Sequence, residues 1–139
     1  MTEISRTAHD MISKMTPTLR PGVFAFVTTT DDAQAAVLEP EAIASFKEDE
    51  GVSLIVPAAL AAARGLETDQ PMCCITLNVY SSLEGVGLTA AVSAALGAKG
   101  IPCNMVAAYH HDHAFVPADR AEEAMQVLRA LQARTAKGG

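Results

Sequence analysis

A short turn in the second half of the sequence has the residue types of a small-molecule site. Ser81 to Gly87 (SSLEGVG) stands between a predicted strand and a predicted helix, so its backbone N–H groups are those of a helix start. A helix N-terminus carries about half a positive charge and suits a carboxylate. The Glu84 carboxylate suits an amine, and the two demands together fit an α-amino acid zwitterion. The alternative is that Ser81 and Glu84 form a capping box and only begin the helix.

A histidine-rich turn is the second candidate for chemistry. If this segment is extended, His111 and His113 share a face beside Asp112, an arrangement able to bind a divalent metal or to transfer protons. No third ligand stands at metal spacing, so no metal site is predicted. The alternative, which we favour, is that these side chains shape the bend between two strands.

Other catalytic and metal-binding patterns are missing from the sequence. It has no nucleophile elbow, phosphate-binding glycine loop or His-Glu metal helix. Cys73, Cys74 and Cys103 show neither a disulfide framework nor zinc spacing, and we expect them to be buried thiols. We therefore predict a protein that is not an enzyme and needs no cofactor.

The elements around the turn follow from residue spacing. Residues 73–80 alternate between two chemically distinct faces, as a strand does. Apolar residues then recur at helical spacing from Leu88 to Leu96, and Gly100 supplies the stop. The predicted elements of this half are a strand at 73–80, a helix from Gly87 to Lys99, strands at 103–109 and 114–116, and a helix that Pro117-Ala118-Asp119 opens and that frays from 135.

The first half has a similar set of elements. A hairpin is expected around residues 48–51, with Gly51 at the positive-φ position of its turn. Pro57 suits the first position of a short helix, which Gly65 ends. The predicted elements are a helix over 1–16, a central strand at 23–29, an irregular connector at 30–40, hairpin strands at 43–47 and 52–56, and a helix at 58–64.

The turn, the helix after it and the next strand resemble an ACT domain, a small ligand-sensing module of amino-acid metabolism. The resemblance rests on Glu84-Gly85-Val86-Gly87-Leu88 followed by Gly100-Ile101. The longer segments SSLEGVGLTAAVSAAL (81–96) and HDHAFVP (111–117) are similar to a bacterial family of two tandem ACT-like repeats. That family is related to the regulatory domains of aspartate kinase and to Castor-type arginine sensors. Val86 stands where the usual ACT turn has proline.

The resemblance implies that a ligand binds at this turn, at an interface between modules. It also implies a counterpart in the first half at residues 48–54 (EDEGVSL), which resembles a segment lining the sites of the Castor-like sensors. The alternative there is a solvated hairpin tip. The candidate ligand-binding residues are Ser81, Ser82, Leu83, Glu84, Val86, Gly87, Leu88, Asn104, Glu48, Glu50, Gly51, Val52 and Ser53.

An internal repeat supports a fold of two related halves. Val56-Pro57-Ala58 and Val116-Pro117-Ala118 form the same strand-to-helix joint in both halves. The predicted fold class is α+β, with two interlocked ferredoxin-like (ACT-like) halves, 1–70 and 71–139, each an antiparallel sheet with helices on one face. The strand at 73–80 is expected to close one sheet and open the next. Open sheet edges favour a homodimer over a monomer.

Composition narrows the choice of partners. The 139-residue chain has a net charge of −6, which argues against nucleic acid or an anionic membrane as the main partner. It has no apolar stretch long enough to span a bilayer and no signal-peptide pattern, so we expect a cytoplasmic protein. The leading hypothesis is a sensor of a small amino-acid-like ligand that passes occupancy to a protein partner. The alternatives are a metal- or histidine-dependent enzyme at the His110–His113 turn and a structural dimer that binds a protein.

Overall fold

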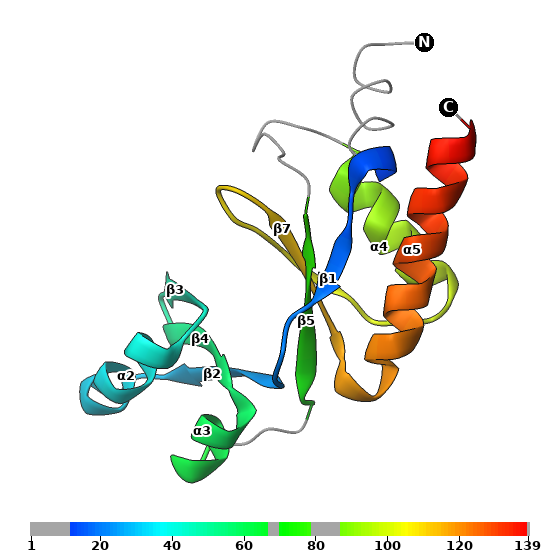
Figure 1. Cartoon of the computed structure of the whole chain (residues 1–139). Coiled ribbons are helices and arrows are strands. Elements are labelled where there is room, and N and C mark those ends of the chain that lie inside the picture. Colours follow the sequence, from blue (N-terminus) through cyan, green and yellow to red (C-terminus); the bar gives the residue numbers. More distant parts are fainter. Residues whose placement is uncertain (1–11, 67–69, 79–86, 139) are drawn as a thin grey trace. The chain divides into compact units, whose positions relative to one another are not determined.

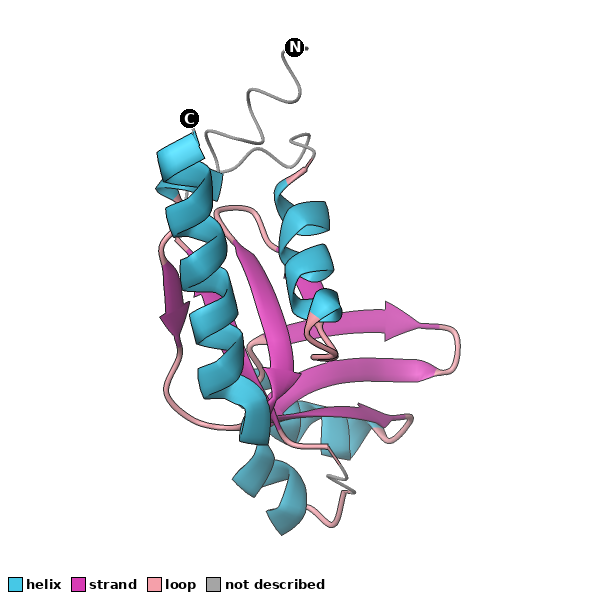
Figure 2. Cartoon of the chain, turned by 90° about the vertical axis from the view of Figure 1, so that its right-hand side faces the viewer, coloured by secondary structure: helices cyan, strands magenta, loops and turns pink. Residues whose placement is uncertain are grey.

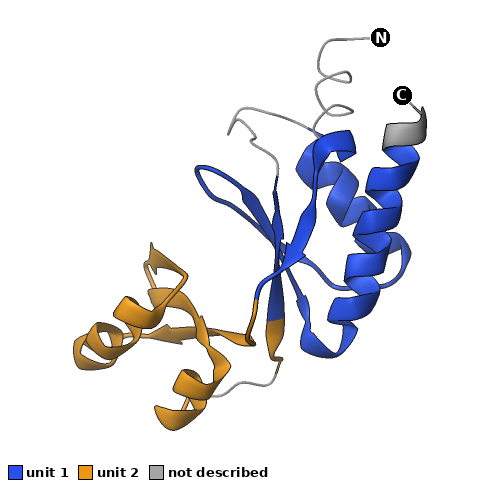
Figure 3. Ribbon diagram, in the orientation of Figure 1, with its two compact units in different colours: residues 1–20, 73–139 blue, residues 21–72 orange. Residues whose placement is uncertain are grey.

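The structure, a computed structural model of the whole chain, describes residues 12–66, 70–78 and 87–138 (Figure 1). The chain divides into two compact units (Figure 3). The small unit is Pro21–Met72, and the large unit combines Met1–Arg20 with Cys73–Gly139. The N-terminal segment therefore belongs with the C-terminal half, and the small unit is inserted in the sequence between the two segments of the large unit. The predicted boundary between the two sequence repeats, between residues 70 and 71, stays a prediction.

The small unit is an antiparallel sheet whose helices pack on one face. Within it the strands lie in the order β3-β4-β2, and Phe24 of β2 also pairs with Met72. Alternate residues of β2 and β4, such as Val27 and Leu54, form the core with Leu38 and Ala61 from the helices. Its elements are β2 (Phe24–Thr29), α2 (Asp32–Leu38), a 3-10 turn (Glu39–Glu41), β3 (Ala44–Glu48), β4 (Gly51–Pro57) and α3 (Ala58–Ala63).

The large unit repeats this order with longer helices. Its strands lie in the order β1-β5-β7-β6, with β1 antiparallel to β5 and β6 antiparallel to β7. Figure 2 shows α4 and α5 on the same side of these strands. Its elements are β1 (Pro17–Leu19), β5 (Met72–Leu77), α4 (Leu88–Ala98), β6 (Asn104–Ala107), β7 (Asp112–Pro117), a 3-10 turn (Ala118–Arg120) and α5 (Ala121–Gly138).

The core of the large unit lies between its sheet and its helices. Ile75 and Leu77 of β5 are fully buried there against Val92 of α4 and Leu128 of α5. Burying a leucine-sized side chain contributes about 1.5–3 kcal/mol, so this stripe outweighs the weak helix propensity of β-branched Val92. The predicted apolar stripe of α4 is confirmed, and Leu128 gives α5 a buried side as well. Cys73 and Cys74 are buried thiols as predicted, whereas Cys103 is only partly buried.

The predicted repeat is confirmed at the level of the backbone. Pro57 has φ −55° and ψ 134°, and Pro117 has φ −54° and ψ 136°. Each proline ends its strand, because its ring fixes φ and it offers no N–H to the sheet. A helical turn begins at the next residue in both units. The two units therefore share the same strand-to-helix joint, with the proline before the helix and not at its first position.

The connector predicted at residues 30–40 is wrong, because most of it is helix α2. Asp31 begins the helix: its carboxylate accepts hydrogen bonds from the N–H groups of Ala33 (2.9 Å) and Gln34 (3.2 Å). Leu38, the last residue of α2, is completely buried. A helix of this length shows too few apolar repeats for a periodic pattern to stand out in the sequence.

Further differences concern three strands and the chain ends. Residues 17–19, for which no element was predicted, form β1 opposite 75–77 of β5. The strand predicted at 114–116 begins earlier, at Asp112, so Asp112 and His113 lie in β7 and not in the bend. The strand predicted to be central, β2, is not buried on both faces, since Phe26 is 45% exposed. At the chain ends, α5 continues to Gly138, and the predicted helix over 1–16 lies outside the described residues except for 12–16, of which 12–14 are helical.

Candidate ligand-binding site

The predicted turn in the large unit is described only at its helical end. Candidates Ser81, Ser82, Leu83, Glu84 and Val86 lie outside the described residues. Gly87 precedes α4 with φ +104°, a value that favours glycine, and its carbonyl accepts the first helical hydrogen bond, from Ala91 N–H at 2.8 Å. Leu88 is buried beneath the helix start, and Asn104 is the exposed first residue of β6.

The small unit has a cavity of about 330 Å³ at the same point of its fold, where β2 joins α2. The tip of the β3–β4 hairpin forms the other wall. Glu48, Glu50, Gly51 and Val52, all predicted from the sequence, line this cavity. Ser53 is absent from the lining, but its hydroxyl donates to the Glu48 carboxylate. The lining residues that sequence reasoning missed are Thr29, Thr30, Asp31, Asp32, Ala35, Lys47 and Asp49.

Gly51 lets the hairpin approach the end of β2. Its φ is +147°, and an added Cβ would lie only 2.8 Å from the carbonyl oxygen of Thr29 and 3.3 Å from the Thr30 side chain. Any larger residue would therefore push the hairpin away from the β2–α2 joint. The spacing between the two walls of the cavity depends on this glycine.

The carboxylate of Asp31 already satisfies the first N–H groups of α2. The Asp31 N–H in turn donates to the Thr29 hydroxyl at 3.0 Å. The start of this helix is therefore occupied by a side chain of the protein, and a ligand carboxylate would meet a negative charge there. Asp31 was missed in the sequence because the helix that it caps was missed.

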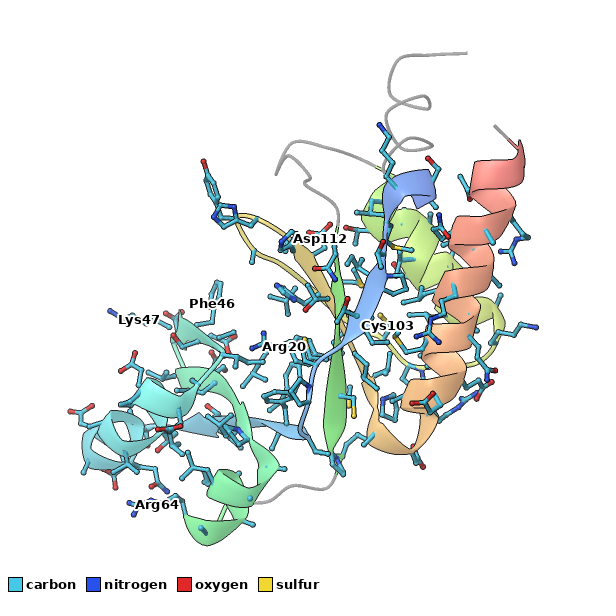
Figure 4. The ribbon with its side chains drawn as sticks, in the orientation of Figure 1. Arg20, Phe46, Lys47, Arg64, Cys103 and Asp112 are labelled. Atoms are coloured by element: carbon cyan, nitrogen blue, oxygen red, sulfur yellow. The ribbon has the colours of Figure 1, made fainter. Side chains whose placement is uncertain are left out.

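The cavity lining is strongly acidic. Carboxylates at Asp31, Asp32, Glu48, Asp49 and Glu50 face one cation, Lys47. Phe46 and Lys47, neighbours on β3, point to different sides of the strand (Figure 4). The arrangement suits an ammonium group and contains no nucleophile paired with a base.

The histidine-rich segment is divided between the two faces of β7. His113 lies with its Nδ1 3.0 Å from Thr76 Oγ1 and 3.9 Å from Cys74 Sγ. Asp112 is buried on the opposite face, where the Thr89 hydroxyl donates to its carboxylate at 3.5 Å. His110 is exposed and stacks edge-on against Tyr109. Because successive strand residues alternate in direction, Asp112 cannot join His113 in one ligand set.

These surroundings shift the pKa values of His113 and Cys74. Burial, and then the positive charge of Arg20, lowers the pKa of His113, and burial raises the pKa of the Cys74 thiol. A neutral imidazole beside a protonated thiol is not an activated nucleophile. Among residues 12–66, 70–78 and 87–138, no three His, Cys, Asp or Glu side chains are placed to hold a metal ion.

A second hollow, of about 450 Å³, lies between α4 and α5 in the large unit. Its lining combines three alanines with the charged residues Lys99, Glu123 and Arg134. No pattern in the sequence predicts this hollow. Its lining residues are Ala95, Ala98, Lys99, Glu123, Gln126, Val127, Ala130 and Arg134.

Comparison with known proteins identifies the fold. Two ACT domain models match the sequence, at residues 6–73 and 71–130. A crystal structure of a Vibrio cholerae protein of unknown function, described as a possible transport protein, is 36% identical with a TM-score of 0.81. The match covers 94% of this chain and 99% of that one. The chain belongs to the ACT domain family. The family resemblance predicted from the sequence is thereby confirmed.

More distant structures share the ACT fold alone. An Agrobacterium tumefaciens protein is 15% identical with a TM-score of 0.61, and the match covers 85% of this chain and 89% of that one. The regulatory subunit of aspartate kinase from Thermus flavus is 12% identical with a TM-score of 0.55, covering 84% and 95%. No curated protein matches the sequence.

The two ACT units place their strand-to-helix joints at equivalent points, β2–α2 and β5–α4. ACT domains are regulatory modules that bind small amino-acid ligands and are typically not catalytic. The cavity of the small unit lies at one of these joints, and the predicted turn ends at the other. None of the described helices has the length and apolar character needed to cross a bilayer.

Proposed function

We propose that the protein is a non-catalytic cytoplasmic sensor that binds an amino acid or similar small zwitterion at its ACT joints and passes occupancy to a protein partner. The observation that carries this proposal is the cavity at the β2–α2 joint of the small unit. Its volume of about 330 Å³ is near the lower end of the roughly 300–1,000 Å³ of small-molecule pockets. A cavity of this size suits a small metabolite better than a large cofactor.

The lining supports recognition of the amine of such a ligand. Glu48 and Glu50 stand opposite the β2–α2 joint, and Lys47 is the one lining cation. Each of these acidic residues is exposed, and an exposed ion pair contributes about 1 kcal/mol or less. Affinity at this joint must therefore also come from enclosure of the ligand. At the second joint, in the large unit, the helix start at Gly87 is the proposed partner of a ligand carboxylate and Glu84 the proposed partner of its amine.

Calorimetry and thermal denaturation with the proteinogenic amino acids test the proposal. A ligand at 100 times its Kd should stabilise the protein by about 2.7 kcal/mol. Glu48→Gln and Glu84→Ala should keep the fold and weaken binding, each at its own joint. Glu41→Gln removes an exposed charge of the small unit that does not line the cavity, and it should bind as the wild type does. If no amino acid stabilises the protein at millimolar concentration, the sensor role is wrong.

We also infer a homodimer formed at the free edge of β3. This strand ends the sheet order of the small unit, and its central Phe46 is 71% exposed. In an antiparallel pair of two β3 strands centred on Phe46, the two phenyl rings would face each other, and such cross-strand aromatic pairs stabilise sheets. Edge pairing would also satisfy backbone groups that the free edge leaves to water.

Light scattering after size-exclusion chromatography tests the dimer. Phe46→Lys should give a monomer, because two lysines would then face each other across the new strand pair. Tyr109→Lys is the matched control, since Tyr109 is an equally exposed aromatic residue (70%) outside β3. A wild-type protein that is monomeric at micromolar concentration would rule out the dimer. It would not bear on the ligand site, which calorimetry tests.

A further inference from the structure

One face of the large unit's sheet collects basic and polar side chains from neighbouring strands. The pairing of β1 with β5 continues one residue beyond β1, where the Arg20 N–H donates to the Cys74 carbonyl at 2.9 Å. Residues opposite each other in an antiparallel pair share a face. Arg20 therefore lies on the face of Cys74 and Thr76, while Ile75 points into the core beneath α4 and α5. Figure 4 shows Arg20 beside β5, on the side away from these helices.

The adjacent strand β7 adds His113 to this face. Its Nδ1 lies 3.0 Å from the Thr76 hydroxyl. Arg20, Thr76 and His113 are each half-buried, so they are partly withdrawn from solvent but still accessible. Three side chains that can donate hydrogen bonds thus come from the end of β1 and from its neighbours in the sheet, β5 and β7.

The charges on this face are not balanced. Among the described residues, the guanidinium of Arg20 makes no ion pair with a carboxylate. Burial first, and then the charges of Arg20 and His111, lower the pKa of His113, and the neighbouring residue Asp112 is turned to the opposite face. Cys74, from β5, is protonated because burial raises its pKa. A guanidinium that no described carboxylate neutralises, beside an imidazole, favours an incoming anion.

We propose that Arg20, Thr76 and His113 form a binding site for a small oxyanion, a carboxylate or phosphate group, on the helix-free face of the large unit. The fork of Arg20 can bind two oxygens of such a group. When His113 carries a proton on Nδ1 it donates to Thr76, which leaves the threonine hydroxyl hydrogen to donate to the anion. This site lies on the sheet face and not at a strand-to-helix joint, so it goes beyond the proposed sensing function and is tested apart from it.

NMR titration of the histidine side chains tests the site. The pKa of His113 is measured in chloride, acetate and phosphate at equal ionic strength, with His113→Gln used to assign its signal. Acetate or phosphate should raise the His113 pKa by about half a unit or more relative to chloride, because a bound anion stabilises the imidazolium. A rise in acetate identifies a carboxylate site, and a rise only in phosphate identifies a phosphate site.

Two arginine variants make the experiment decisive. Arg20→Gln should raise the His113 pKa in chloride, because a repelling charge is gone, and should abolish the further rise in the other salts. Arg129→Gln removes an exposed arginine of α5 and should behave as the wild type does. The proposal is overturned if the His113 pKa is the same in all three salts, or if the rise persists in Arg20→Gln.

Discussion

The two ACT units use one backbone plan and begin their first helices in opposite ways. In the small unit the Asp31 carboxylate occupies the start of α2. In the large unit α4 starts after Gly87, which has no side chain to place there. Their helix-free faces also differ: Phe26 and Phe46 are exposed in one, whereas Arg20 and His113 lie on the other. A shared fold therefore fixes where a ligand can bind but not which charge it must carry.

The largest expected difference between the units is in stability. The buried core of the small unit contains fewer side chains than that of the large unit, and Leu38 is fully enclosed in it. Leu38→Ala should destabilise the small unit by about 3 kcal/mol through lost contacts and a cavity. The neighbouring Val37→Ala, at a residue 41% exposed, should cost far less.

Hydrogen exchange measured by mass spectrometry separates the two units in that experiment. Amides of β2, β3 and β4 should lose protection in Leu38→Ala while those of β5 and β7 keep theirs, if each unit depends on its own core. Equal loss of protection in both units would show that they unfold as one and would remove this part of the comparison.

Two glycines, one in each unit, should respond to alanine with opposite signs. Gly51→Ala forces a Cβ to within 2.8 Å of the Thr29 carbonyl oxygen at a positive φ, so a loss of about 1–3 kcal/mol is expected. Gly97→Ala, at an exposed position in the last turn of α4 where an added Cβ would meet no atom within 4 Å, should gain about 0.4–1 kcal/mol. Urea unfolding of both variants provides the measurement, and a stabilised Gly51→Ala would contradict the tight approach of the hairpin to β2.

Sequence periodicity revealed the longer elements and missed the features that close contact creates. The stripe of α4 and the Pro57 and Pro117 joints were predictable, since apolar spacing and proline chemistry are local. Helix α2 was not, because its length gives too little periodicity. The cavity was half predictable. Glu48, Glu50, Gly51 and Val52 came from a family resemblance, but their approach to Thr29–Asp32 depends on tertiary pairing of β2 with β4. The contact between His113 and Thr76 likewise arises only from strand order.

A substitution at Asp31 tests the difference between the two helix starts. Asp31→Ala deletes the cap of α2 and should destabilise the small unit by about 1 kcal/mol. Asp32→Ala, which removes a neighbouring charge that makes no capping bond, should cost less. Urea midpoints compare the two variants. Equal costs would mean that charge near the helix start matters and the hydrogen bonds to Ala33 and Gln34 do not.

The smallest expected effect is a pH dependence confined to the large unit. Burial lowers the pKa of His113 in the folded state below the ordinary histidine value of about 6.5. As pH falls through about 6.5, the unfolded chain takes up a proton that the folded His113 still refuses, so stability decreases until pH passes the lowered folded pKa. His113→Gln should flatten this decrease, measured as the urea midpoint between about pH 7.5 and pH 5. His110→Gln, at an exposed ring, should leave it unchanged, and an identical pH profile in both variants would mean that His113 is not the group responsible.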